Sequence, residues 1–135
     1  MHYKKFEYTT TIKKEHLDMF NHVNNASYLV LFESARWDLI TKNGYGAEKI
    51  RETQLAPTIL ELKLAFKKEL KLDDVILIET QITFHKNKIG ILSQKIFREN
   101  ELCCEAEFTI GLFDLKERKL VLPTQDWLHA VGISN

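Results

Sequence analysis

The feature that most constrains this chain is residues 26–41, a stretch with helical spacing that is apolar most of the way round. Its apolar side chains recur every three or four positions, at Tyr28, Phe32, Ala35 and Leu39. A helix on a protein surface needs only one apolar stripe, so we expect other structure to enclose this one, at least over its first turns. Gly44 is a natural stop after its C-terminal end.

The rest of the chain shows mainly the two-residue alternation of half-buried β-strands. One strand precedes the helix, a short polar segment at residues 47–52 is predicted to be helical, and alternation is then expected to continue to the end of the chain. The predicted strands span residues 5–13, 60–67, 76–84, 89–98 and 102–112. Asn100 is expected to turn the fourth of these strands into the fifth.

The order strand, helix, four strands predicts antiparallel pairing of the meander type after the helix, because the connections are short. Each strand offers one apolar face, and the helix is the only element apolar enough to receive several of them. We therefore predict an α+β hotdog fold, a curved antiparallel β-sheet wrapped around one long buried helix. Neither a linker nor an internal repeat interrupts the sequence, so we expect one domain over residues 1–135.

The composition of the chain argues against several classes of function. Nineteen basic and nineteen acidic residues cancel, so no global field draws the protein to nucleic acid. The first residues have no apolar leader segment and no later stretch is long enough for a membrane span, which favours a cytoplasmic protein. Cys103 and Cys104 are adjacent, which suits neither a disulfide framework nor a zinc site, and we expect both to be reduced and structural.

Residues 15–25, just before the helix, concentrate Asp, His and Asn beside apolar residues. Backbone N–H groups in the first turn of a helix have no internal acceptor, and the helix dipole favours negative charge against them. Such a site can hold an oxyanion. Thioester hydrolysis needs an oxyanion site together with a carboxylate that attacks the carbonyl or activates water.

The segment Asp18-Met19-Phe20-Asn21-His22-Val23-Asn24-Asn25-Ala26-Ser27-Tyr28-Leu29, followed by Phe32-Glu33-Ser34-Ala35-Arg36, resembles the hydroxybenzoyl-CoA thioesterase family. In that family an Asp four residues before the His of an H-V-N-N-type motif is the catalytic carboxylate. The resemblance therefore implies an acyl-CoA thioesterase with Asp18 in that role. It further implies a hotdog fold with active sites at the subunit interfaces of a homodimer, or of a tetramer built as a dimer of dimers.

The sequence departs from the family at several positions. Asn21 replaces the Gly that is common just before the His, and His16 stands where many members carry another Asp. Members often carry a P-x-x-x-G-D pattern at the later turn, where this chain has Glu69 and Asp73 in place of the Pro and the Gly. Plant-type acyl-carrier-protein thioesterases carry Asn where this chain has Phe20.

Each candidate residue also has a structural interpretation. Asp18 could simply cap a turn; with its motif, catalysis is the better hypothesis. For His22 a direct role and a structural one stay open. Asn24 or Asn25 is expected to cap the helix, with substrate binding the alternative. Tyr28 is expected in the core or the pocket wall, and we expect Met19 and Phe20 to join it as apolar surroundings for Asp18.

Other chemistries find less support. Glu33 and Arg36 are three residues apart on an apolar helix, so a structural ion pair is expected. His16 and His22 show no metal-ligand spacing with Asp18, and neither a metal nor a redox cofactor is required. The sequence has no Gly-x-Ser-x-Gly elbow and no phosphate-binding glycine loop. Its basic turns at residues 86–88 and 116–119 are interpreted as solvated surface rather than as CoA phosphate sites.

The sequence thus predicts hydrolysis of an acyl thioester, most plausibly acyl-CoA with an acyl-carrier protein as the other possible carrier. Asp18 is expected to act as nucleophile or general base, with helix N–H groups as the oxyanion site. Two alternatives remain: a hotdog hydratase or dehydratase, and a non-catalytic protein that binds acyl thioesters. The thin sheet also leaves strand edges that are normally paired or protected, which favours a homodimer.

Overall fold

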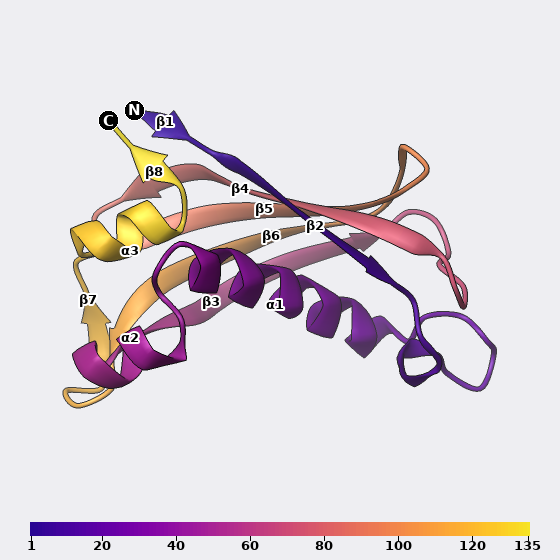
Figure 1. The fold of residues 1–135 in the computed structure, drawn as a ribbon, viewed down its shortest axis with the longest axis horizontal. Helices are drawn as coiled ribbons and strands as arrows, with labels where there is room; N and C mark the ends of the chain where they lie inside the picture. The colour runs from indigo at the N-terminus through magenta and orange to yellow at the C-terminus, as the bar shows by residue number, and fades with distance from the viewer.

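The structure is a computed structural model that describes residues 1–135 (Figure 1). Its main helix is α1 (Asn25–Lys42), and two shorter helices follow, α2 (Ala47–Thr53) and α3 (Gln125–Ala130). A 3₁₀ turn (Lys14–His16) lies between the first long strand and α1. The strands are β1 (His2–Tyr3), β2 (Lys5–Thr11), β3 (Leu55–Phe66), β4 (Val75–Lys86), β5 (Ile89–Arg98), β6 (Glu101–Asp114), β7 (Lys119–Val121) and β8 (Ile133–Ser134).

The main sheet is antiparallel and has the order β2-β4-β5-β6-β3, with β7 paired to the end of β6. Strands β4, β5 and β6 form the predicted meander, but β3 lies beside β6 at the far edge instead of beside β4. The prediction of chain-order pairing is therefore wrong for β3. Two-residue alternation specifies which face of a strand is buried and says nothing about its neighbour, so the pattern could not reveal this crossover.

The long helix lies against the sheet, as the hotdog prediction required (Figure 1). Its bounds differ from the predicted 26–41 by one residue at each end, and Gly44 follows it at φ +89°, confirming the expected stop. The buried side of α1 packs into one cluster with the inward residues of the strands. Phe32 and Phe108, for example, meet edge to face at 5.9 Å between ring centroids.

The helix is less enclosed than expected. Val30 and Trp37 are 54% and 41% exposed, so one apolar side of α1 remains open in the single chain. The expected ion pair is also absent, because Glu33 points to solvent while the Arg36 guanidinium donates to Gln94 Oε1 at 2.8 Å. Gln94 is fully buried and donates in turn to Phe32 O and Thr80 Oγ1, so an amide rather than a carboxylate satisfies this polar group in the core.

The C-terminal region also differs from the prediction, because alternation does not continue to the end. Helix α3 packs the buried Trp127 against Tyr45 just after α1, with 5.3 Å between ring centroids. Cys103 and Cys104 are both buried and unpaired. None of the helices is both long and apolar enough to cross a membrane.

The two ends of the sheet carry different loops (Figure 1). Helices α2 and α3 lie at one end. At the other end, the segment before α1, the β3–β4 connection and the β5–β6 turn come together. This second end contains the candidate site.

Candidate active site

The Asp18 segment folds as a tight loop ahead of α1. Leu17 and Val23 form an isolated antiparallel bridge, and the Asp18 N–H donates to His22 O at 3.0 Å. Asn21 adopts φ +63°, which explains why a Gly suits this position in related sequences and why Asn can replace it. The loop therefore places Asp18 and His22 opposite each other.

The two oxygens of the Asp18 carboxylate have different surroundings. Oδ1 accepts a hydrogen bond from the Phe20 N–H at 2.8 Å, as in the turn-capping interpretation. Oδ2 lies 3.4 Å from His22 Nδ1 in an electrostatic contact that lacks hydrogen-bond geometry. The Asp18 side chain is 24% exposed, so this second oxygen is held in place and still accessible.

The start of α1 provides the electrophilic side of the site. Asn24 is the N-cap, and its Oδ1 accepts from the Ala26 N–H at 2.9 Å, so this capping prediction is confirmed for Asn24 and not for Asn25. The Ser27 N–H bonds to Asn24 O. Asn25 lines the pocket at the positive end of the helix, and its N–H is left without an acceptor in the chain, so the first turn of α1 keeps a free backbone donor beside the pocket.

Tyr28 forms the inner wall one turn further along α1. It is 5% exposed and meets the Phe66 ring edge to face at 5.0 Å. Burial raises the pKa of Tyr28 to about 12, and the neighbouring Cys104 adds to the shift, while the nearby Leu70 backbone opposes it. The phenol therefore stays protonated at neutral pH and can donate a hydrogen bond.

All five residues proposed from the sequence meet in one open pocket of about 670 Å³: Asp18, His22, Asn24, Asn25 and Tyr28. The opposite wall, Phe66 to Glu69, was not predicted. It comprises the last residue of β3 and the start of the β3–β4 connection, which reach the site only because β3 lies at the far edge of the sheet. The sequence offered one signal here, the turn at which the hydroxybenzoyl-CoA thioesterase family often has a Gly, and Asp73 adopts φ +70° at that position.

The two residues expected to surround Asp18 with apolar groups have different outcomes. Met19 is 87% exposed and does not line the pocket, so that part of the prediction is wrong. Phe20 does line the pocket, although it is 72% exposed, and it stacks on the His22 ring at 5.9 Å between centroids. The other apolar groups of the pocket belong to Val23, Tyr28 and Phe66.

A second cavity, smaller and more enclosed, lies near the other end of α1. Its volume is about 100 Å³ and its wall is mainly apolar, with Trp37, Ile40, Ile59 and Trp127 among the lining residues. It contains no residue of the Asp18 loop. We identify the open pocket as the candidate active site because the carboxylate and the unpaired helix N–H both lie there, whereas the enclosed cavity offers mainly apolar packing.

Comparison with known proteins points to the same chemistry. The family model of the thioesterase-like superfamily matches residues 12–131. The long-chain acyl-CoA thioesterase FadM of Escherichia coli is 33% identical over 110 residues, which cover 80% of this chain and 83% of FadM.

Solved structures show the same fold. The probable thioesterase YbaW of Escherichia coli has a TM-score of 0.80 at 27% identity, covering 92% of this chain and 94% of YbaW. A Staphylococcus aureus protein, SAV2348, determined in complex with CoA, has a TM-score of 0.87 at 20% identity, covering 97% of this chain and 84% of that protein.

Proposed function

Because this chain belongs to the thioesterase-like superfamily, we propose that Asp18 is the carboxylate with which it hydrolyses acyl-CoA thioesters to a free carboxylic acid and CoA. The observation that carries the proposal is the placement of Asp18 Oδ2 in the same pocket as the unpaired Asn25 N–H. One group supplies negative charge for attack, and the other receives the negative charge that develops on the carbonyl oxygen.

The reaction follows from these two groups. The Asn25 N–H, at the positive end of α1, donates a hydrogen bond to the thioester carbonyl oxygen and polarises the carbonyl. Asp18 either takes a proton from a water that attacks the carbonyl carbon, or attacks that carbon itself to form an anhydride that water then opens. Either way the carbon–sulfur bond breaks, the thiolate leaves with a proton, and the sum is water plus acyl-CoA to acid plus CoA. The protonated Tyr28 hydroxyl is placed to bind the substrate from the inner wall.

Asp18→Asn tests this assignment, because it is nearly isosteric and removes the charge that both routes need. We expect single-turnover hydrolysis to fall on the order of 10²–10⁴-fold, the usual contribution of general-base assistance. Binding of a non-hydrolysable thioester analogue should persist. Asp38→Asn is the matched control, because Asp38 makes only an ion pair with Lys42 on the outside of α1. Normal hydrolysis by the folded Asp18→Asn protein would show that the assignment is wrong.

A panel of acyl-CoA and acyl-carrier-protein substrates distinguishes the alternatives. A thioesterase releases free thiol, a hydratase or dehydratase changes the acyl group without releasing it, and a binding protein does neither. We expect thiol release from acyl-CoA. Short, long and aromatic acyl groups in the panel identify the substrate within this class.

We also propose that the protein forms a homodimer, or a tetramer built as a dimer of dimers. Strands β2 and β3 are both free edges in the single chain, and free edges are normally paired or covered. The β3 edge carries the half-exposed Leu62 and Phe66, and the open side of α1 carries Val30 and Trp37. Sedimentation at micromolar concentration should show dimers or tetramers, and fully active monomers alone would contradict the proposal.

We also propose that the enzyme is cytoplasmic. Its two cysteines are unpaired, which suits a reducing compartment, and cell fractionation tests this proposal.

A further inference from the structure

The connection between β3 and β4, residues 67–74, has to pass over the end of the β5–β6 hairpin, because those two strands lie between β3 and β4 in the sheet. The hairpin turns through Glu99 and Asn100, both at positive φ, which leaves Arg98 as the last residue of β5 directly at the crossing. This arrangement brings the connecting loop against a single guanidinium.

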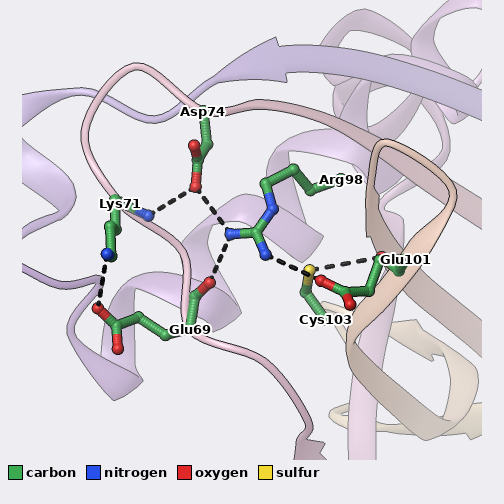
Figure 2. Close-up of polar contacts among 6 residues, drawn as sticks. All are labelled: Glu69, Lys71, Asp74, Arg98, Glu101 and Cys103. Carbon is green, nitrogen blue, oxygen red and sulfur yellow. Dashed lines mark hydrogen bonds and ion pairs between the residues drawn. The ribbon is translucent and has the colours of Figure 1, made fainter.

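Arg98 binds the loop through two contacts and its own hairpin through a third (Figure 2). Nη1 donates to the backbone Glu69 O at 2.7 Å and to Asp74 Oδ2 at 3.1 Å, and Nη2 donates to Glu101 Oε1 at 3.0 Å. Asp74 Oδ2 also accepts from the Lys71 N–H at 2.8 Å. The hydrogen bonds that Arg98 donates to Asp74 and Glu101 raise its pKa above the ordinary value, so the side chain stays charged.

The carbonyl that Arg98 binds belongs to the Glu69–Leu70 peptide, and Glu69 itself lines the candidate pocket. Arg98 therefore fixes one peptide of the pocket wall directly. Leu70 is fully buried, and its own carbonyl accepts from the Val23 N–H at 3.2 Å, next to the helix cap.

We propose that Arg98 is a positioning residue of the active site, acting through the Glu69–Leu70 peptide. By fixing this peptide, Arg98 places Glu69 in the pocket wall and, through the Leu70 carbonyl, holds Val23, and with it the start of α1, in register with Asp18. Arg98 does not line the pocket and touches no substrate. The proposal rests on the proposed function, and it makes Arg98 a determinant of turnover rather than of substrate affinity.

Substitution of Arg98 tests the proposal. Arg98→Met removes all three contacts, and Arg98→Lys keeps the charge with too few directed donors to reproduce them. We expect kcat to fall about tenfold in Arg98→Met, the lower end of the contribution of a charge-assisted hydrogen bond. Arg98→Lys should lose less, and binding of a non-hydrolysable thioester analogue should change by about threefold or less. Glu101→Gln, which weakens only the contact to the hairpin, is the matched control and should stay close to wild type.

A double-mutant cycle separates positioning from general support of the fold. If Arg98 acts by holding the start of α1, then Arg98→Met should lower kcat less in an Asn24→Ala background, where the helix start has already lost its cap, than in wild type. A merely stabilising residue gives additive effects. Additive effects, or an unchanged kcat in folded Arg98→Met, would overturn the proposal. If Arg98→Met does not fold, Arg98→Lys carries the same cycle.

Amide hydrogen exchange gives a readout that does not depend on activity. In Arg98→Met or Arg98→Lys the Leu70 and Val23 amide protons should exchange faster, while buried amides of β4 stay protected. Unchanged exchange at Leu70 and Val23 would overturn the positioning role. If no acyl-CoA is hydrolysed by the wild type, the proposed function fails, and the exchange experiment still decides whether Arg98 holds this peptide.

Discussion

The two ends of α1 are built for different purposes. At its N-terminal end the helix meets a polar, open pocket made of loops, where Asp18 keeps one carboxylate oxygen accessible and Asn25 keeps an N–H unpaired. At its C-terminal end it meets helix α3 and a small apolar cavity, where Trp127 is buried and Asn43 Nδ2 donates to Ala130 O. One end thus leaves polar groups unsatisfied for chemistry, while the other satisfies them and contributes packing.

The N-terminal end of α1, which carries the pocket, therefore needs local contacts that hold its loops in place. The residues of the pocket sit on loops, and loops are held by few buried contacts. The tight loop around Asp18, the Asn24 cap and the Arg98 contacts supply that support locally. Substitutions at the C-terminal end should therefore change stability, and substitutions at the N-terminal end should change turnover.

The largest expected effect of this comparison is that of Trp127→Ala. Removing a buried aromatic side chain typically costs about 3–5 kcal/mol of unfolding free energy, and this one also loses its contact with Tyr45. Denaturant unfolding measures the loss. At a temperature where the variant is folded, kcat should match wild type, and a kcat that falls in parallel with stability would break the proposed separation. Leu128→Ala, on the same helix and only half-buried, should lose less.

The structure at the two ends of α1 could be predicted from the sequence only where the signal is a local sequence pattern. The helix and the Asp18 loop could be predicted, because apolar spacing and the concentration of Asp, His and Asn are local. Helix α3 could not, because its six residues are too short for a period to be recognised. The wall from Phe66 to Glu69 depends on β3 pairing with β6, which is a long-range choice among similar alternating strands.

The hydrogen-bond partners of polar side chains were also hard to predict from the sequence. Arg36 has an acidic residue three positions away, yet it binds Gln94, which is 58 residues distant and buried beneath the helix. The choice between Asn24 and Asn25 as helix cap also depended on a backbone angle that adjacent identical residues do not reveal. In both cases the hydrogen-bond partner of a side chain depends on which donors and acceptors the fold brings close to it. Those neighbours are known only from the three-dimensional arrangement.

The next effect separates the two roles of the helix start. Asn24→Ala removes the cap and should cost about 1 kcal/mol of unfolding free energy. Asn24→Ser should keep both stability and kcat, because Ser caps well without charge. Asn24→Asp should keep the stability and lower kcat, because a carboxylate beside the Asn25 N–H repels the developing oxyanion. Thermal unfolding and saturating kinetics of the three variants check this. If Asn24→Asp turns over as fast as wild type, the helix start is not the oxyanion site.

A smaller effect is expected for His22→Ala. Its contact with Asp18 is 3.4 Å long and its side chain is 44% exposed, and exposed ion pairs contribute about 0–1 kcal/mol. We therefore expect kcat/KM to fall about fivefold or less with the fold intact, through weaker positioning of Asp18 and the substrate. Complete loss of hydrolysis in a folded variant that still binds the thioester analogue would instead assign His22 an indispensable catalytic role.

The smallest effect is expected for Asp126→Asn, near the C-terminal end of α1, and it should change only the stability of the fold. Lys49 of α2 bonds to Asp126 of α3 at 2.8 Å, and this hydrogen bond lowers the pKa of the Asp126 carboxyl below its ordinary value. A carboxyl whose pKa is lower in the folded state stabilises the fold above its unfolded pKa, and that contribution is lost as the pH falls through the folded pKa. Both side chains lie at the surface, so the contribution is small and salt should weaken it. Thermal unfolding should thus show Asp126→Asn slightly less stable than wild type at neutral pH and equal to it in strong acid, with kcat unchanged. A stability difference that persists in strong acid would show that Asp126 acts through packing rather than through its charge.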